Sequence, residues 1–93
     1  MDTKEIISKS RPIFRRNDVI KAGIFGSFVR GEAKKKSDID FLVQFKGRKS
    51  LFDLVELREE LKNIFRKDVD VITYSSIHPL LKDKILSDEV KII

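Results

Sequence analysis

The amino-acid sequence predicts an α/β fold in which helices flank a small mixed sheet of three strands. Three apolar runs rich in β-forming residues predict the strands, at 19–25, 39–45 and 68–73. Segments with apolar residues at helical spacing alternate with these runs, which is typical of helices that cover a sheet. A chain of 93 residues has room for one core. We therefore expect a single domain over residues 1–93.

The first helix is expected to begin at Asp2 or Thr3, because either side chain can cap a first turn. Its inner side is expected to carry Ile6, Ile7 and Phe14. Pro12 lies within this segment, and a proline inside a helix removes one hydrogen bond and crowds the preceding turn. The sequence therefore predicts a kink or a break into two pieces.

A short polar connection joins the first two strands. The strand at 19–25 ends at Gly26, and residues 27–30 are expected to form a single helical turn. The loop at 32–37 then contains three consecutive lysines. The second strand, 39–45, follows this loop and ends before a Lys-Gly dipeptide.

The clearest helix pattern follows the second strand. Ser50 and Asp53 form an N-terminal cap pair. Apolar residues then recur at helical spacing up to about Arg66, namely Leu51, Leu54, Val55, Leu57, Leu61, Ile64 and Phe65. Beyond the third strand, Pro79 suits the first turn of a last helix that extends to about Ser87. Residues 90–93 are compatible with a short edge strand or a frayed tail.

Three aspartates are the candidate catalytic and metal-binding residues. Asp38 and Asp40 lie one residue apart where the second strand begins, so both point to the same face of the sheet. Asp70 lies inside the third strand, where a carboxylate without partners is costly to bury. Converging carboxylates repel one another unless a cation lies between them, and oxygen ligands of this kind suit Mg²⁺. The arrangement predicts a phosphoryl- or nucleotidyl-transfer site.

Each of these acids also has a simpler explanation. An Asp-x-Asp sequence can merely keep a strand edge soluble, and Asp38 could form a local turn with Ser37. Such a turn accounts for one acid but not for three. Asp68 is a second candidate on the face of Asp70, although its place at the junction of helix and strand favours a solvated turn acid.

A candidate phosphate-binding turn precedes the carboxylates. Gly26 follows a strand and precedes a helical turn, so its backbone can approach a ligand closely and helix-start N–H groups can receive phosphate oxygens. Ser27 adds a hydroxyl. Arg30 is near enough in sequence to reach a phosphate, and it is equally suited to the surface at the sheet edge. Alone, a Gly-Ser dipeptide is most often a simple turn.

Together these residues resemble a known signature. The run Gly-Ser-Phe-Val-Arg-Gly at 26–31, followed by Ser-Asp-Ile-Asp-Phe-Leu-Val at 37–43, is similar to that of the DNA polymerase β-type nucleotidyltransferase superfamily. More narrowly, the chain resembles the minimal nucleotidyltransferases, or MNT proteins, over most of its length. The resemblance implies the nucleotidyltransferase fold. It also implies that the matching residues Gly26 and Ser27 hold the phosphates of a nucleotide.

The resemblance implies a reaction as well. The matching residues Asp38, Asp40 and Asp70 would bind two Mg²⁺ ions that promote in-line attack by a hydroxyl on an NTP, expected to be ATP. Asp70 would face this hydroxyl and take its proton. The family often has a basic residue after Gly-Ser, and Phe28 replaces it here. Family members commonly occur as antitoxins of HEPN-type RNase toxins, so a HEPN-type partner protein is the expected acceptor.

The composition bears on partners and location. A net charge of +5, from 20 basic and 15 acidic side chains, favours polyanionic partners, although both signs could simply solvate the surface. Lys34, Lys35 and Lys36 could meet a triphosphate, nucleic acid or an acidic partner, or stay hydrated. The absence of cysteine excludes thiolate metal sites. No signal-like start and no apolar run near ~18 residues are present, so we expect a cytoplasmic protein without a membrane partner.

Three functions of different classes stay open at this point. The first is Mg²⁺-dependent transfer of NMP, most simply AMP, to a hydroxyl acceptor. The second is a non-catalytic module that neutralises a partner protein by covering its surface, which the small size and Phe28 favour. The third, nucleic-acid binding through the lysine loop, is weaker because no aromatic stacking platform accompanies the lysines.

Overall fold

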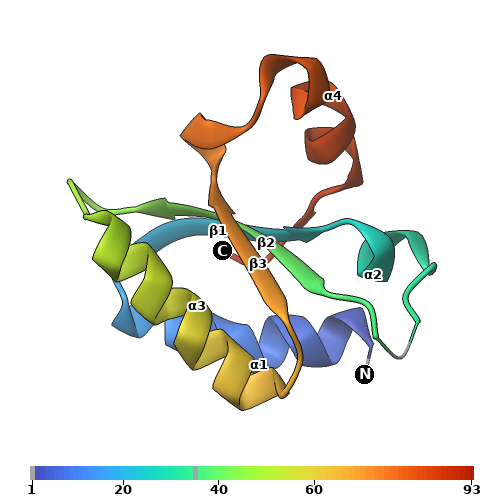
Figure 1. The fold of residues 1–93 in the computed structure, drawn as a ribbon, viewed down its shortest axis with the longest axis horizontal. Coiled ribbons are helices and arrows are strands. Elements are labelled where there is room, and N and C mark those ends of the chain that lie inside the picture. Colours follow the sequence, from blue (N-terminus) through green and yellow to red (C-terminus); the bar gives the residue numbers. More distant parts are fainter. Residues whose placement is uncertain (1, 35) are drawn as a thin grey trace.

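The computed structural model describes residues 2–34 and 36–93, so Lys35 of the lysine loop lies outside the described residues. The helices are α1 (Thr3–Arg16), α2 (Ser27–Arg30), α3 (Leu51–Phe65) and α4 (Pro79–Asp88), with a 3-10 turn at Tyr74–Ser76 (Figure 1). The strands are β1 (Val19–Phe25), β2 (Ile39–Phe45), β3 (Val69–Thr73) and β4 (Val90–Lys91).

The sheet is mixed, as expected, but it has four strands rather than three, in the order β3-β2-β1-β4. β1 pairs antiparallel with both β2 and β4, whereas β2 pairs parallel with β3. The additional strand spans two residues, which confirms the short edge strand that was one of the two alternatives for residues 90–93. Pairing continues beyond it, because the backbone N–H of Ile92 donates to the carbonyl of Ala22 over 2.8 Å.

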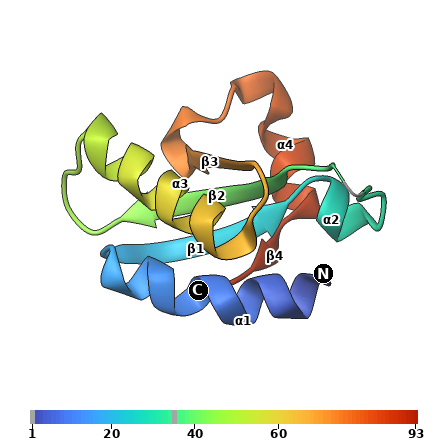
Figure 2. The same ribbon diagram turned by 60° about the horizontal axis from the view of Figure 1, so that its bottom comes forward.

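One face of the sheet carries the core. α1 and α3 cover this face, and α4 lies on the other side of the sheet (Figures 1 and 2). Phe41 of β2 is central, with its ring centroid 5.4 Å from that of Phe14 in α1 and 6.1 Å from that of Phe65 in α3. All three side chains are buried. The aromatic cluster thus joins both helices to the second strand.

α1 is one continuous helix, so the expected break at Pro12 is wrong. Its first turn is capped by Asp2, as predicted. Pro12 is exposed, whereas Ile6, Ile13 and Phe14 are buried against the sheet. A proline inside a helix costs about 3 kcal/mol, whereas burial contributes roughly 1.5–3 kcal/mol for each large apolar side chain. Packing of the inner face therefore outweighs the lost hydrogen bond.

α3 begins with the expected capping box. The backbone N–H of Ser50 donates to Oδ2 of Asp53 over 2.8 Å. The residues of α3 that become buried are Leu57, Leu61 and Phe65. Leu51, Val55 and Ile64, which belong to the same apolar pattern, are exposed. The helix contacts the core along a single i, i+4 line, which is narrower than its apolar pattern.

α4 is held at the surface. His78 caps this helix, because its Nδ1 atom accepts from the N–H of Leu80 over 3.1 Å. None of the ten residues of the helix is buried. In the part of the chain that the structure describes, no helix combines the length and the apolar character needed to cross a membrane.

Candidate active site

Parallel pairing of β2 and β3 brings two of the predicted carboxylates side by side. In the register of these strands Asp40 is the partner of Asp70, and Ile39 is the partner of Val69. Neighbouring strands lie about 4.8 Å apart, and side chains at paired positions point to the same face. Since Ile39 and Val69 belong to the core cluster, Asp40 and Asp70 lie on the opposite face of the sheet. Asp40 and Asp70 thus share one face of the sheet, whereas the common face expected for Asp38 and Asp40 stays a prediction.

The environment of Asp40 is unfavourable to its negative charge. Burial raises the pKa of Asp40 from 3.8 to about 6, with further contributions from the charges of Asp70 and Asp38. The charge of Arg30 acts in the opposite direction. Asp38 and Asp70 are both exposed. The structure therefore places three acids within electrostatic reach of one another, with Asp40 the most enclosed of them.

Gly26 brings the predicted phosphate turn directly against Asp40. Phe25, at the end of β1, is the register partner of Asp40 on β2. The backbone of Gly26 has φ 83° and ψ −151°, a region that essentially only glycine occupies. A Cβ atom at this position would overlap Oδ2 of Asp40. Glycine is therefore required twice here, by backbone conformation and by close approach to the carboxylate.

The predicted helical turn after Gly26 is confirmed. The carbonyl of Gly26 accepts from the N–H groups of Val29 and Arg30 at 3.1 and 3.2 Å, which starts α2. The N–H groups that open a helix have no partner within it, so those of Ser27 and Phe28 can bind an anion. Ser27 itself is half-buried. The local structure has the donors that phosphate binding needs.

Arg30 is engaged by two carboxylates. Its Nε atom is 3.1 Å from Oε2 of Glu32, and its Nη1 atom is 3.0 Å from Oδ2 of Asp88 at the end of α4. These hydrogen bonds, that of Glu32 first, raise the pKa of Arg30. The side chain thus lies near Asp40, as its charge effect requires, yet it ties α2 to α4. A role for Arg30 at a phosphate stays a prediction.

The carboxylate face has the ligand chemistry of a Mg²⁺ site without a complete set of ligands. Among the residues that the structure describes, no group of three or more His, Cys, Asp and Glu side chains is arranged to hold a metal ion. Mg²⁺ commonly takes one or two protein carboxylates and completes its shell with water and substrate phosphates. The neighbouring oxygens of Asp40 and Asp70 fit that requirement. A site in which Asp38 also ligates the metal stays a prediction.

Two other sequence-based assignments concern residues close to this site. Asp68 is an exposed surface acid, as favoured by its position, and Lys62 lies 3.6 Å from it. Phe28 packs against the core cluster, half-buried, and the Nζ atom of Lys67 lies 5.9 Å from the centre of its ring. Position 28 is therefore part of the packing of α2 rather than a solvent-facing substitute for a basic residue.

One polar network on the carboxylate side of the sheet escaped the sequence analysis. The hydroxyl of Tyr74 donates to Glu89, and Lys21 lies 4.4 Å from the centre of the Tyr74 ring. Burial, followed by the contact with Glu89, raises the pKa of Tyr74. A Cβ atom on Gly23 would overlap the Glu89 side chain. A glycine inside a strand was the available signal, since it often marks a close approach.

Comparison with known proteins assigns this architecture to a family. Residues 7–92 match the nucleotidyltransferase domain family. A Methanocaldococcus jannaschii protein, provisionally named protein adenylyltransferase MJ0435, is 52% identical over 93 residues, which cover 100% of both chains.

Solved structures agree with this family on the fold. A structure provisionally described as a minimal nucleotidyltransferase superposes with a TM-score of 0.81 at 27% identity, over 97% of this chain and 95% of that one. A structure of a tri-AMPylated Shewanella oneidensis HEPN toxin in complex with an MNT antitoxin has a TM-score of 0.76 at 20% identity. This second match covers 97% of this chain and 71% of that chain. The chain therefore belongs to the nucleotidyltransferase domain family, and within it to the minimal nucleotidyltransferases.

Proposed function

We propose that the protein transfers AMP from ATP to a hydroxyl group of a partner protein in a Mg²⁺-dependent reaction. The observation that carries this proposal is the pairing of Asp40 with Asp70 directly beside the turn of Gly26. A phosphate-binding turn and paired carboxylates at one end of a sheet are the minimum that nucleotidyl transfer requires.

Each residue of the site has a distinct part in the proposed reaction. Asp38, Asp40 and Asp70 would hold the metal, which supplies charge to stabilise the pentavalent transition state and the leaving group when bound. The backbone at Gly26 and the hydroxyl of Ser27 would bind phosphate oxygens and align the nucleotide.

Bond making and breaking then follow from this alignment. The acceptor oxygen forms a bond to the α-phosphorus, and the bond from that phosphorus to the bridging oxygen of pyrophosphate breaks. Asp70, exposed on β3, takes the proton of the acceptor hydroxyl. The products are an adenylylated acceptor and pyrophosphate, so atoms and charges balance.

A HEPN-type protein is the proposed acceptor. The support comes from similar proteins: a similar chain lies in a structure that contains an AMPylated HEPN toxin and an MNT antitoxin. A full-length relative at 52% identity has a provisional adenylyltransferase name.

Labelled ATP tests the proposal. The purified protein is mixed with Mg²⁺, ATP labelled on the α-phosphate and a HEPN-type partner protein. We expect label on the partner with the native chain and with Glu56→Ala, which removes an exposed acid of α3. We expect no label with Asp38→Ala or Asp40→Ala. Equal labelling by all four proteins would overturn the assignment of these carboxylates.

A non-catalytic binding function is the second candidate. The side chains of Leu80 and Leu81 on α4 are 87% and 52% exposed, which gives the chain an apolar surface for a partner. Toxicity of the HEPN-type partner separates the two functions. If Asp38→Ala and Asp40→Ala still neutralise the partner as well as the native protein does, surface coverage rather than transfer is responsible.

A further inference from the structure

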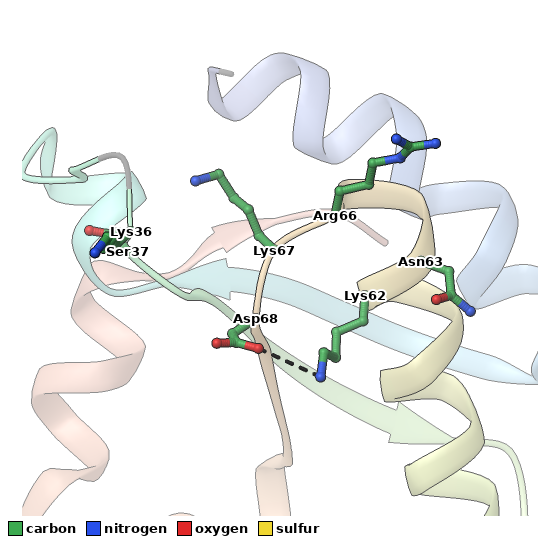
Figure 3. Close-up of a pocket in the computed structure, with 7 residues that line it drawn as sticks. All are labelled: Lys36, Ser37, Lys62, Asn63, Arg66, Lys67 and Asp68. Atoms are coloured by element: carbon green, nitrogen blue, oxygen red, sulfur yellow. Dashed lines mark ion pairs between the residues drawn. The ribbon is translucent and has the colours of Figure 1, made fainter.

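A second anion-binding feature lies beside the carboxylates. A pocket of about 630 Å³ opens between the end of the lysine loop and the C-terminal end of α3 (Figure 3). Four of its lining side chains are cationic, namely Lys36, Lys62, Arg66 and Lys67. Asp68 is its one lining acid among the described residues, and it lies 3.6 Å from Lys62. The pocket therefore has a clear excess of positive charge.

The end of α3 creates this concentration of cations. The N–H of Arg66 donates to the carbonyl of Lys62 over 2.8 Å, and Arg66 adopts a left-handed conformation with φ 53° that ends the helix. The chain then turns toward β3, and Lys67 extends from this turn toward the loop that carries Lys36 (Figure 3). Two segments far apart in the sequence thus bring their charges to one place.

The pocket adjoins the candidate active site. Ser37, which lines the pocket, directly precedes Asp38. The backbone N–H of Ile39 donates to the carbonyl of Asp68 over 3.1 Å and joins the two walls of the pocket at the start of β2 and β3. Asp68 is two residues before Asp70, a distance of roughly 6–7 Å along a strand. The pocket therefore borders the two segments of chain that lead into the candidate carboxylates.

We propose that this pocket binds an acidic segment of the acceptor protein and so presents the neighbouring hydroxyl to the active site. The proposal rests on the proposed transfer of AMP to a protein. Carboxylate side chains of the acceptor pair with Lys36, Arg66 and Lys67, while its hydroxyl extends toward Asp70.

The lining favours a polypeptide over nucleic acid. None of the lining residues that the structure describes is aromatic, so bases have no surface on which to stack. The cations gather in one pocket instead of following a groove, which suits a short group of carboxylates better than a continuous phosphate backbone. Asp68 within the lining would also repel closely spaced phosphates, whereas a flexible acidic peptide can avoid it.

Charge reversal on the two sides of the pocket tests the proposal. The variant Lys36→Glu with Lys67→Glu is compared with Lys46→Glu with Arg48→Glu, which changes the net charge equally. Lys46 and Arg48 are exposed at the opposite end of β2. The probe is a fluorescein-labelled oligoglutamate peptide with one tyrosine, and its anisotropy is followed at low and high salt. A single-stranded RNA of equal charge serves as the competing ligand.

We expect the dissociation constant for the peptide to rise about tenfold in the pocket variant and to change little in the matched control. Mg²⁺-ATP should raise the melting temperature of all three proteins equally, which reports on the nucleotide site separately. If Mg²⁺-ATP does not raise the melting temperature of the native protein, the proposed transfer of AMP is contradicted. The peptide measurement still tests whether the pocket binds an acidic segment. A Lys36→Gln with Lys67→Gln variant replaces the reversal variant if the latter does not fold.

Several results would overturn the proposal. Equal weakening in both charge-reversal variants would mean that only overall charge matters. Tighter binding of the RNA, lost in the pocket variant alone, would assign the pocket to nucleic acid. Loss of Mg²⁺-ATP stabilisation in the pocket variant alone would assign it to the nucleotide.

Discussion

The two faces of the sheet differ in chemistry although the same strands build both. Toward α1 and α3, β2 presents Ile39, Phe41 and Val43, which have no exposed surface. Toward the other face the same strand presents Asp40, half-buried and next to Asp70 of β3. Alternation along one strand therefore separates stability from reactivity. The site can therefore tolerate unfavourable charge, because the opposite face supplies the packing.

The core face should show the largest effect on stability. Phe41→Ala removes the ring that contacts both Phe14 and Phe65, and truncation of a buried phenylalanine costs about 3–5 kcal/mol. Gln44→Ala, at an exposed position of the same strand, serves as the control and should cost less than about 0.5 kcal/mol. Urea unfolding measures both. Similar losses in the two variants would contradict the division between the faces.

In the turn that follows β1, Gly26→Ala is expected to lower the free energy of unfolding by about 1–3 kcal/mol. Alanine is strained at this φ and ψ, and its Cβ atom would overlap Asp40. Gly31→Ala is the matched control, since Gly31 also has a positive φ but a Cβ there would meet nothing within 4 Å. Both variants should lose stability in thermal unfolding, Gly26→Ala more than Gly31→Ala. Only Gly26→Ala should also lose transfer activity, and retention of activity would show that Asp40 can move without harm.

On the carboxylate face, a stabilising substitution is expected. The pKa of Asp40 in the folded protein is about 6, against an ordinary value of 3.8, so the folded state holds the proton more tightly than the unfolded state. Stability should therefore fall as the pH rises from about 4 to about 6, as the carboxyl ionises in the folded state. Asp40→Asn removes the unfavourable charge of the ionised carboxyl. It should raise the free energy of unfolding by about 1–2 kcal/mol at about pH 8, after allowance for solvent screening, and leave it unchanged at about pH 4.

Thermal unfolding across this pH range measures the gain of Asp40→Asn over the native protein. Mg²⁺ should narrow the difference near neutral pH, because a bound cation would relieve the repulsion only in the native protein. A constant difference at every pH would indicate a packing effect of the amide rather than the titration of the carboxyl.

The smallest change in stability is expected at Asp38. Its side chain is exposed, so Asp38→Asn should alter the free energy of unfolding by less than about 0.5 kcal/mol. Under the proposed function, transfer of labelled AMP should nevertheless be lost. A variant that folds normally and transfers normally would remove Asp38 from the site and leave Asp40 and Asp70 as the candidate metal ligands.

Local patterns account for the parts of the fold that the sequence predicted correctly. The runs of β-forming residues located β1, β2 and β3 within a residue. The glycine before α2 indicated the tight turn now found against Asp40. These features depend on neighbours in sequence, so periodicity and turn chemistry are sufficient to find them.

Features that depend on distant segments were beyond such reasoning. Arg30 and Asp88 form an ion pair although 58 residues of sequence separate them, and neither segment has a local pattern that indicates the other as its partner. The same holds for the contact between Tyr74 and Glu89. Pro12 stays within a helix because tertiary packing overrides a local preference. Which apolar residues of α3 become buried was likewise decided by the partners that the helix meets.

The short strand β4 protects the backbone of β1. Next to β4, the N–H groups of Ile92 and Ile93 donate to the carbonyl of Ala22. The backbone groups along this edge of the sheet are therefore hydrogen-bonded within the same molecule. At the opposite margin, Nε of Arg58 donates to the carbonyl of Val69 over 2.9 Å. Trimming the last four residues would leave β1 open to backbone pairing with a second copy, and self-association would follow. Two residues of strand thus shield the edge of β1 within the same molecule.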